Sequence, residues 1–210
     1  MQKFDGLLLD FDGTLVNSLD SLFNIYMNFL SSYNISGTHE EFNHFNGFKL
    51  TTIIKSLQAT YNIPGSIDNL ISHYYSKIEN IYIDTPPMDG AEELIKYAYS
   101  NNILIGIVSS ANRSCISRWV NRYFPNYVSI IVGGDDVSKG KPNPMPYLTA
   151  ASKLSLEPIN CLCVEDSVIG IQSAINSGSN VILLDKNDSI LINYSYVKKV
   201  KNLKEIIKLL

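Results

Sequence analysis

Short continuous runs of apolar residues, and apolar residues at helical spacing, divide this chain into two kinds of segment. The first continuous run, residues 6–9, leads directly into Asp10, and such a run is typical of a buried strand in a parallel sheet. Similar runs predict further strands at residues 103–108, 128–132, 159–164 and 180–184.

Between the first strand and about residue 85, the apolar residues recur at the spacing of amphipathic helices. This spacing predicts helices over residues 19–33, 50–61 and 67–81. The consecutive prolines Pro86 and Pro87 indicate a link back to the strands, because proline resists both helix and central strand. We therefore expect an all-helical unit at residues 16–85, inserted into a core made of residues 1–15 and 86–210.

The rest of the chain alternates strand runs with helical spacing. Helices are predicted to include residues 91–98, 116–123, 147–154, 168–175 and 203–210. Strands alternating with helices build a doubly wound α/β core with a mostly parallel sheet. The predicted fold class is therefore α/β, a doubly wound parallel sheet with a small inserted helical unit.

The composition narrows the choice of partners. The 210 residues are 45% hydrophobic and 18% charged, with a net charge of −3, which is ordinary for a soluble globular protein and leaves no basic footprint for nucleic acid. No apolar run approaches the length of a membrane span, and the N-terminal run leads into acids rather than a cleavage site. We expect a cytoplasmic protein, by default a monomer, that binds neither nucleic acid nor membrane.

The cysteines form no convincing disulfide or zinc pattern. Cys161 and Cys163 alternate within a predicted strand, where they are expected to pack as small hydrophobic residues. A redox role for them is the alternative.

Two carboxylates stand at the end of the first strand. Asp10 and Asp12 precede a turn at Gly13 and Thr14, on the edge of an α/β sheet where ligands bind. Like charges this close are costly without a cation or a shared proton. The pair therefore predicts a metal site, although a simple strand end with an Asp-Gly turn is the alternative.

Later strand ends carry further polar groups: Ser109 and Ser110 after one strand, Lys141 before a helix, and Glu165 and Asp166 after another strand. Taken singly, each has a plain explanation, as a helix cap or a solvated side chain. Their occurrence at or just beyond successive strand ends instead predicts one phosphate-binding site.

The sequence DFDGTL after an apolar strand resembles the first motif of the haloacid dehalogenase-like (HAD) superfamily, in its phosphatase branch. The later positions match the family's other motifs in order: Ser109 the second, Lys141 the third, Glu165 with Asp166 the fourth. The resemblance covers the whole chain and implies a Rossmann-like core with a helical cap. It also implies an enzyme, a phosphoric monoester hydrolase.

The resemblance implies a role for each residue. Asp10 is the expected nucleophile, which forms an aspartyl-phosphate, and Asp12 the expected acid and base. Lys141 and Ser109 are expected to hold the phosphate. The expected Mg²⁺ lies between the phosphate, Asp10, the backbone carbonyl of Asp12 and Asp166, with Glu165 contributing directly or through water.

The expected substrate is a small phosphorylated metabolite, such as a sugar phosphate or phosphoglycolate. Ser110 and Lys49 are further candidate substrate contacts, Lys49 because the family places such contacts in the cap loop. A β-phosphoglucomutase-like mutase is the first alternative, although that family has an arginine in this loop. Phosphonoacetaldehyde hydrolysis and a non-enzymatic phosphate-responsive binding module are the others.

Overall fold

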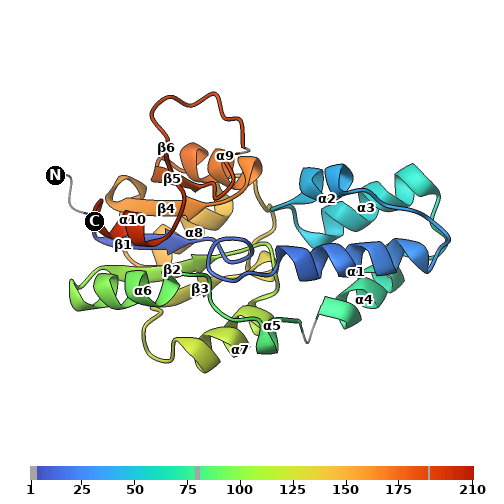
Figure 1. Cartoon of the computed structure of the whole chain (residues 1–210), viewed down its shortest axis with the longest axis horizontal. Helices are drawn as coiled ribbons and strands as arrows, with labels where there is room; N and C mark the ends of the chain where they lie inside the picture. Colours follow the sequence, from blue (N-terminus) through green and yellow to red (C-terminus); the bar gives the residue numbers. More distant parts are fainter. Residues whose placement is uncertain (1–3, 79–80, 189) are drawn as a thin grey trace.

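The computed structural model describes residues 4–78, 81–188 and 190–210. Figure 1 shows two parts side by side, which we call the sheet lobe and the helical lobe. The sheet lobe contains a parallel sheet flanked by helices, and the helical lobe consists of α1 to α4. The predicted α/β fold class is confirmed.

The sheet has six strands in the order β3-β2-β1-β4-β5-β6, all parallel. Their bounds are β1 (Gly6–Leu9), β2 (Leu104–Val108), β3 (Ile130–Val132), β4 (Cys161–Glu165), β5 (Asn180–Leu184) and β6 (Lys198–Val200). Leu9 of β1 lies opposite Ile107 on one side and Val164 on the other. Because β1, β2 and β4 end in register, the polar residues after them meet at one edge of the sheet.

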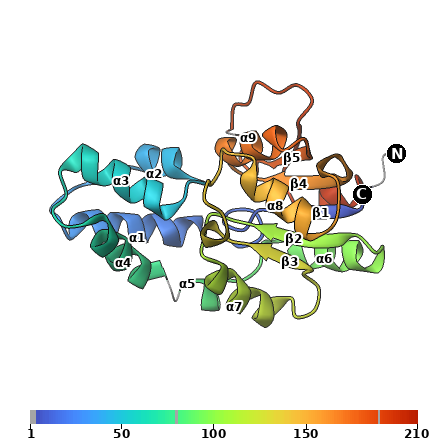
Figure 2. The same cartoon turned by 180° about the vertical axis from the view of Figure 1, so that it is seen from behind.

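Alternation along β1 divides its side chains between two apolar layers. Leu7 and Leu9 pack with α6 (Ala91–Ser100), α7 (Arg113–Tyr123) and α10 (Lys204–Ile207), whereas Leu8 packs with α8 (Met145–Lys153). The helix α9 (Val168–Asn176) shares the second layer through Ala174. Figure 2 shows α8 in front of the strands, on the face turned away from the viewer in Figure 1.

The helical lobe has an apolar core of its own. It is built from α1 (Leu19–Ser31), α2 (His39–Phe45), α3 (Leu50–Tyr61) and α4 (Ile67–Ile78). The chain leaves and re-enters the sheet lobe side by side, where Val16 pairs with Pro87. The predicted domain boundaries fall next to this bridge, and the division itself stays a prediction.

Three elements were missing from the sequence prediction: α2, the short helix α5 (Ile81–Asp84) and β6. The Thr38 side chain caps α2 by accepting a hydrogen bond from Glu41 N, and Thr-x-x-Glu is a helix-start signature that was available in the sequence. By contrast, β6 has only three residues, two of them exposed lysines, and such charged edge strands show no apolar run. Of the predicted helix over 67–81, the structure describes α4 up to Ile78 and places Ile81 in α5, whereas residues 79 and 80 lie outside the described residues.

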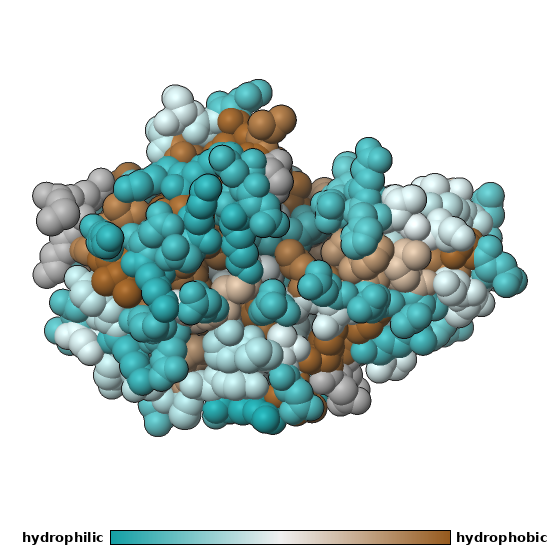
Figure 3. Space-filling model, in the orientation of Figure 1, coloured by the Kyte–Doolittle hydropathy of each residue, from teal (hydrophilic) through white to brown (hydrophobic). Residues whose placement is uncertain are grey.

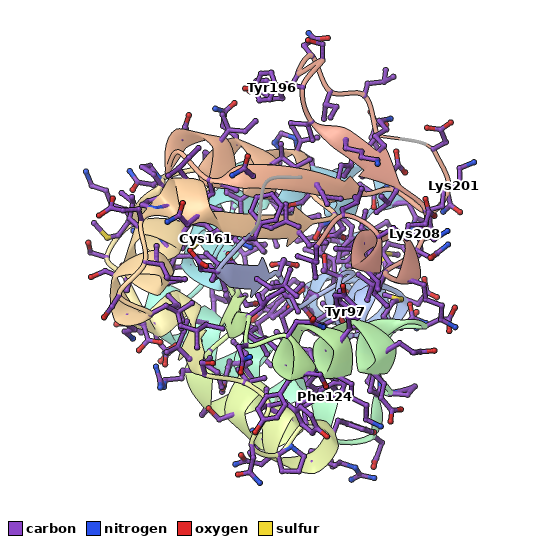
Figure 4. All side chains as sticks on the ribbon, turned by 90° about the vertical axis from the view of Figure 1, so that its left-hand side faces the viewer. Tyr97, Phe124, Cys161, Tyr196, Lys201 and Lys208 are labelled. Carbon is purple, nitrogen blue, oxygen red and sulfur yellow. The ribbon has the colours of Figure 1, made fainter. Side chains whose placement is uncertain are left out.

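Cys161 and Cys163 pack in an apolar layer as small residues, and all three cysteines are buried and free of disulfides. Figure 4 shows Cys161 within the sheet lobe, whereas Tyr196 projects from the segment between β5 and β6. On the surface, patches of apolar side chains lie among hydrophilic ones on both lobes (Figure 3). In the described part of the chain, no helix has the length and apolar character needed to cross a membrane.

The central position of β1 predicts a large stability effect. Leu8→Ala empties a fully buried position between the sheet and α8, and we expect it to lower the free energy of unfolding by about 2–5 kcal/mol. Leu191→Ala is the matched control, because Leu191 is 91% exposed and its loss should change stability by less than about 0.5 kcal/mol. Thermal denaturation of both variants measures this. Equal melting temperatures would contradict the assigned core.

Candidate active site at the carboxyl edge of the sheet

A lysine and two acids form a buried ion-pair cluster at the carboxyl edge of the sheet. Lys141 Nζ lies 2.5 Å from Asp10 Oδ1 and 2.5 Å from Glu165 Oε1, and it donates a hydrogen bond of 3.1 Å to the Val108 carbonyl oxygen. The three charged side chains are at most 8% exposed. β2, β4 and the residue that directly follows β1 thus each supply an acceptor for one ammonium group.

The acids keep Lys141 charged. Burial by itself lowers the pKa of the Lys141 ammonium, but the carboxylates of Asp10 and Glu165 outweigh it, so this pKa lies above its ordinary value. The pKa of Asp10 is raised well above its usual range by burial and by Glu165, against the opposing effect of Lys141. One ammonium therefore compensates only part of the negative charge gathered here.

Asp166 adds a further acid to this edge. Asp10, Glu165 and Asp166 are all buried. One carboxylate oxygen of each lies within 4.8 Å of the corresponding oxygens of the other two. Burial, and then the charge of Glu165, raise the pKa of Asp166 to about 7. A cluster of buried oxygen donors with excess negative charge fits a hard divalent cation such as Mg²⁺.

Glu165 is held by more than the lysine. The Tyr147 hydroxyl donates a hydrogen bond of 2.6 Å to Glu165 Oε1, and Ser167 Oγ donates one of 3.2 Å to Oε2. Tyr147 was not predicted as part of the site. In the sequence, Tyr147 stands on the apolar face of a predicted helix. That position is equally typical of a core residue without a role in the site.

Asp12 has a separate set of partners. Ser18 Oγ donates a hydrogen bond of 2.6 Å to Asp12 Oδ1, and the Tyr82 hydroxyl donates one of 2.9 Å to the same oxygen. Burial raises the pKa of Asp12, although both hydrogen bonds act in the opposite direction. Tyr82 was also missed, since it comes from α5, 70 residues along the chain, and nothing local marks it.

The turn after Asp12 requires glycine. Gly13 has φ +77°, and a Cβ built there would collide with the Asp166 carboxylate. A side chain at this position would therefore strain the backbone and displace a candidate metal ligand.

The other residues predicted to contact the substrate, Ser109, Ser110 and Lys49, each have a hydrogen-bond partner within the protein. Ser109 Oγ accepts a hydrogen bond of 3.0 Å from Ala111 N, which leaves its own proton available to a ligand. Ser110 Oγ donates to the Gly47 carbonyl oxygen at 2.6 Å, and Lys49 Nζ donates to the Val137 carbonyl oxygen at 2.9 Å. Both contacts join the helical lobe to the sheet lobe. Substrate contact by Ser110 or Lys49 stays a prediction.

A cavity of about 110 Å³ opens beside these groups, between the two lobes. Asp10, Asp12, Ser109 and Ser110 line one end, and residues of α1 to α4 supply much of the remaining wall. Lys49 is not among the lining residues. The arrangement presents two acids and a serine hydroxyl to any molecule that enters, with the Lys141 ammonium beside Asp10.

Known proteins share this sequence pattern and fold. Residues 7–184 match the model of the haloacid dehalogenase-like hydrolases. A bifunctional riboflavin kinase/FMN phosphatase of Arabidopsis thaliana is 29% identical over 84% of this chain, which spans only 47% of that relative. A phosphorylated carbohydrates phosphatase of Thermotoga maritima is 23% identical over 83% of this chain and 82% of its own length.

Among solved structures, a putative phosphoglycolate phosphatase from Lactobacillus plantarum superposes with a TM-score of 0.84. It is 22% identical and covers 99% of this chain and 100% of its own, so it shows that the two share a fold. The family match extends from β1 to the end of β5 and includes the edge where the acids and Lys141 meet. The resemblance found in the sequence is thereby confirmed: the chain belongs to the haloacid dehalogenase-like hydrolases.

Proposed function

We propose that this chain is a Mg²⁺-dependent phosphatase that hydrolyses a small phosphorylated metabolite through an aspartyl-phosphate on Asp10. The observation that carries the proposal is the ion pair of 2.5 Å between Lys141 Nζ and Asp10 Oδ1, where Asp10 lines one end of the cavity between the lobes. A carboxylate held by an ammonium at a ligand-accessible strand end has the position and the electrostatic support that a nucleophile needs.

The phosphate would be held by the groups around Asp10. Lys141 offsets negative charge on the phosphoryl oxygens and orients the Asp10 carboxylate. The Ser109 hydroxyl, whose oxygen already accepts from Ala111 N, donates its proton to a phosphate oxygen. Glu165, fixed by Tyr147 and Ser167, acts by keeping Lys141 in place.

Asp10, Asp166 and the backbone carbonyl of Asp12 are the proposed Mg²⁺ ligands, with Glu165 beside them. When bound, Mg²⁺ neutralises negative charge on the phosphate and the acids. The Asn46 amide donates a hydrogen bond of 3.3 Å to Asp166 Oδ2 and so helps to orient this carboxylate from the helical lobe.

Asp12 is the proposed general acid and base. Its raised pKa favours the protonated form that gives a proton to the leaving oxygen, and the resulting carboxylate then takes a proton from the attacking water. Ser18 and Tyr82 both bind Oδ1, which fixes the carboxyl group while it faces the cavity.

The phosphatase is favoured over the mutase by the surroundings of Lys49. A mutase of the β-phosphoglucomutase type must also grip a second phosphate, and Lys49 was the nearby cation predicted in the cap loop. Its ammonium is instead bound to the Val137 carbonyl oxygen. Names of relatives, FMN phosphatase and phosphorylated carbohydrates phosphatase, also support phosphoester hydrolysis.

Asp10→Asn tests the nucleophile. We expect magnesium-dependent phosphate release to fall at least about 10³-fold, because the amide cannot form the aspartyl-phosphate. Asp5→Asn, at the opposite end of β1 and exposed, is the matched control and should keep full activity. Phosphate release from a panel of phosphorylated metabolites is the measurement. Equal activity of Asp10→Asn and the wild type would rule out the proposed nucleophile.

Tyr82→Phe tests the role of Asp12. The hydrogen bond from Tyr82 lowers the pKa of Asp12, so its removal raises that pKa and keeps the general acid protonated to higher pH. We expect the basic limb of the kcat/KM profile to move to higher pH. Tyr74→Phe, in α4 on the cavity wall, should leave the limb in place. A shift of the basic limb to lower pH, or the same shift in both variants, would contradict the proposed role of Asp12 as general acid.

The raised pKa of Asp166 makes metal binding depend on pH. Without metal, Asp166 holds a proton below about pH 7, and that proton competes with Mg²⁺. The affinity for Mg²⁺ should therefore be about tenfold weaker at pH 6 than at pH 8, and Mg²⁺ should raise the melting temperature more at pH 8. The Asp166→Asn variant should lose this stabilisation at both values. Equal stabilisation of the wild type at pH 6 and pH 8 would contradict the assignment.

A further inference from the structure

The cavity beside Asp10 has apolar walls opposite its polar end. Side chains of the helical lobe that line it include Leu22 of α1, Phe45 of α2, Ile53 of α3 and Ile78 of α4. Among the lining residues that the structure describes, none is lysine, arginine or histidine. The organic part of a substrate, beyond the phosphate, would therefore contact apolar side chains rather than positively charged ones.

Cationic side chains close to this region have partners within the protein, among them Arg118, whose guanidinium donates to Cys115 Sγ at 3.6 Å. Lys49 donates to the Val137 carbonyl oxygen, and Lys141 lies between Asp10 and Glu165. Arg113, at the start of α7, pairs with Asp136 at 3.1 Å. None of these cationic side chains lines the cavity, so a carboxylate or a second phosphate there would have no cationic partner unless a side chain moved.

Five of the polar side chains that line the cavity are engaged by the protein itself. Their partners are the Glu41 carboxylate for the Tyr26 hydroxyl, the Cys115 thiol for Tyr75, Asp12 for Tyr82, the Gly47 carbonyl oxygen for Ser110, and Asp166 for Asn46. A ligand with several hydroxyl groups would bury them with few free partners, which is unfavourable. A hydrocarbon group would bury apolar surface, which is favourable.

From these walls we infer the substrate class: a phosphate monoester whose organic part is compact, uncharged and apolar, either aromatic or aliphatic. This inference rests on the proposed phosphatase function and narrows it. The volume of about 110 Å³ is of the same order as apolar protein cavities of about 150 Å³ that bind benzene. Sugar phosphates and phosphoglycolate, expected from the family resemblance, fit these walls less well than such an ester.

Two pairs of esters test this class with the whole chain and Mg²⁺. Benzyl phosphate and 4-carboxybenzyl phosphate differ by one negative charge. Cyclohexylmethyl phosphate and glucose 6-phosphate both carry the phosphate on a CH2 group attached to a six-membered ring, but differ in the ring oxygen and the hydroxyl groups. We expect kcat/KM to be at least about tenfold higher for the apolar member of each pair. Equal values, or a preference for the charged or hydroxylated member, would overturn the inference.

Binding to Asp10→Asn separates this inference from the proposed function. Calorimetry with the same four esters reports the preference of the cavity whether or not phosphate is released. Tighter binding of benzyl and cyclohexylmethyl phosphate supports the apolar class, even if the wild type hydrolyses none of the four and the phosphatase proposal fails. Equal or reversed affinities overturn the apolar class, even if hydrolysis is found.

A charge placed in the wall should change the preference. Ile53→Lys puts an ammonium in the cavity, and we expect it to raise the ratio of kcat/KM for 4-carboxybenzyl over benzyl phosphate at least about tenfold. Thr52→Lys adds the same charge at the exposed neighbouring position of α3 and should leave this ratio unchanged. Equal ratios in the two variants would overturn the inference that these walls contact the organic part of the substrate.

Discussion

The ammonium of Lys141 is the group on which the arrangement of the site depends. It lies between the carboxylates of Asp10 and Glu165, and all three side chains are almost completely buried. Buried charges are tolerated only where partners compensate them. Because these residues come from the position just after β1, from the end of β4 and from the segment before α8, the ion pairs also join three parts of the sheet lobe and set the geometry of its carboxyl edge.

The loop between α2 and α3 couples the helical lobe to this edge. Within a few residues, Asn46 donates to Asp166, the Gly47 carbonyl oxygen accepts from Ser110, and Lys49 donates to the Val137 carbonyl oxygen. The contact from Asn46 reaches Asp166, a candidate metal ligand, and the other two contacts attach the loop to the sheet lobe. The same contacts that place the helical lobe over the edge therefore also orient groups inside the site.

Much of the fold was predictable because its signals are local. The apolar runs predicted five of the six strands, and their alternation with helical spacing predicted the α/β class. The edge strand β6 was not predicted, because its exposed lysines leave no apolar run in the sequence. The helix α2 was not predicted either, although the capping residue Thr38 marks its start. The partners Tyr82 and Tyr147 could not be predicted, since a tyrosine at an apolar position has no local feature that tells a core residue from a hydrogen-bond donor.

The sequence by itself identified the acids, the lysine and the serine at or just beyond successive strand ends, and these residues in turn identified the family. Strand register then brings them together, because neighbouring parallel strands end at one edge. Only the tertiary structure decided which partners their polar atoms have: that Lys49 binds Val137, that Tyr82 holds Asp12, and that the cavity walls are apolar. These contacts join residues tens of positions apart, and tertiary packing of side chains, not local pattern, selects them.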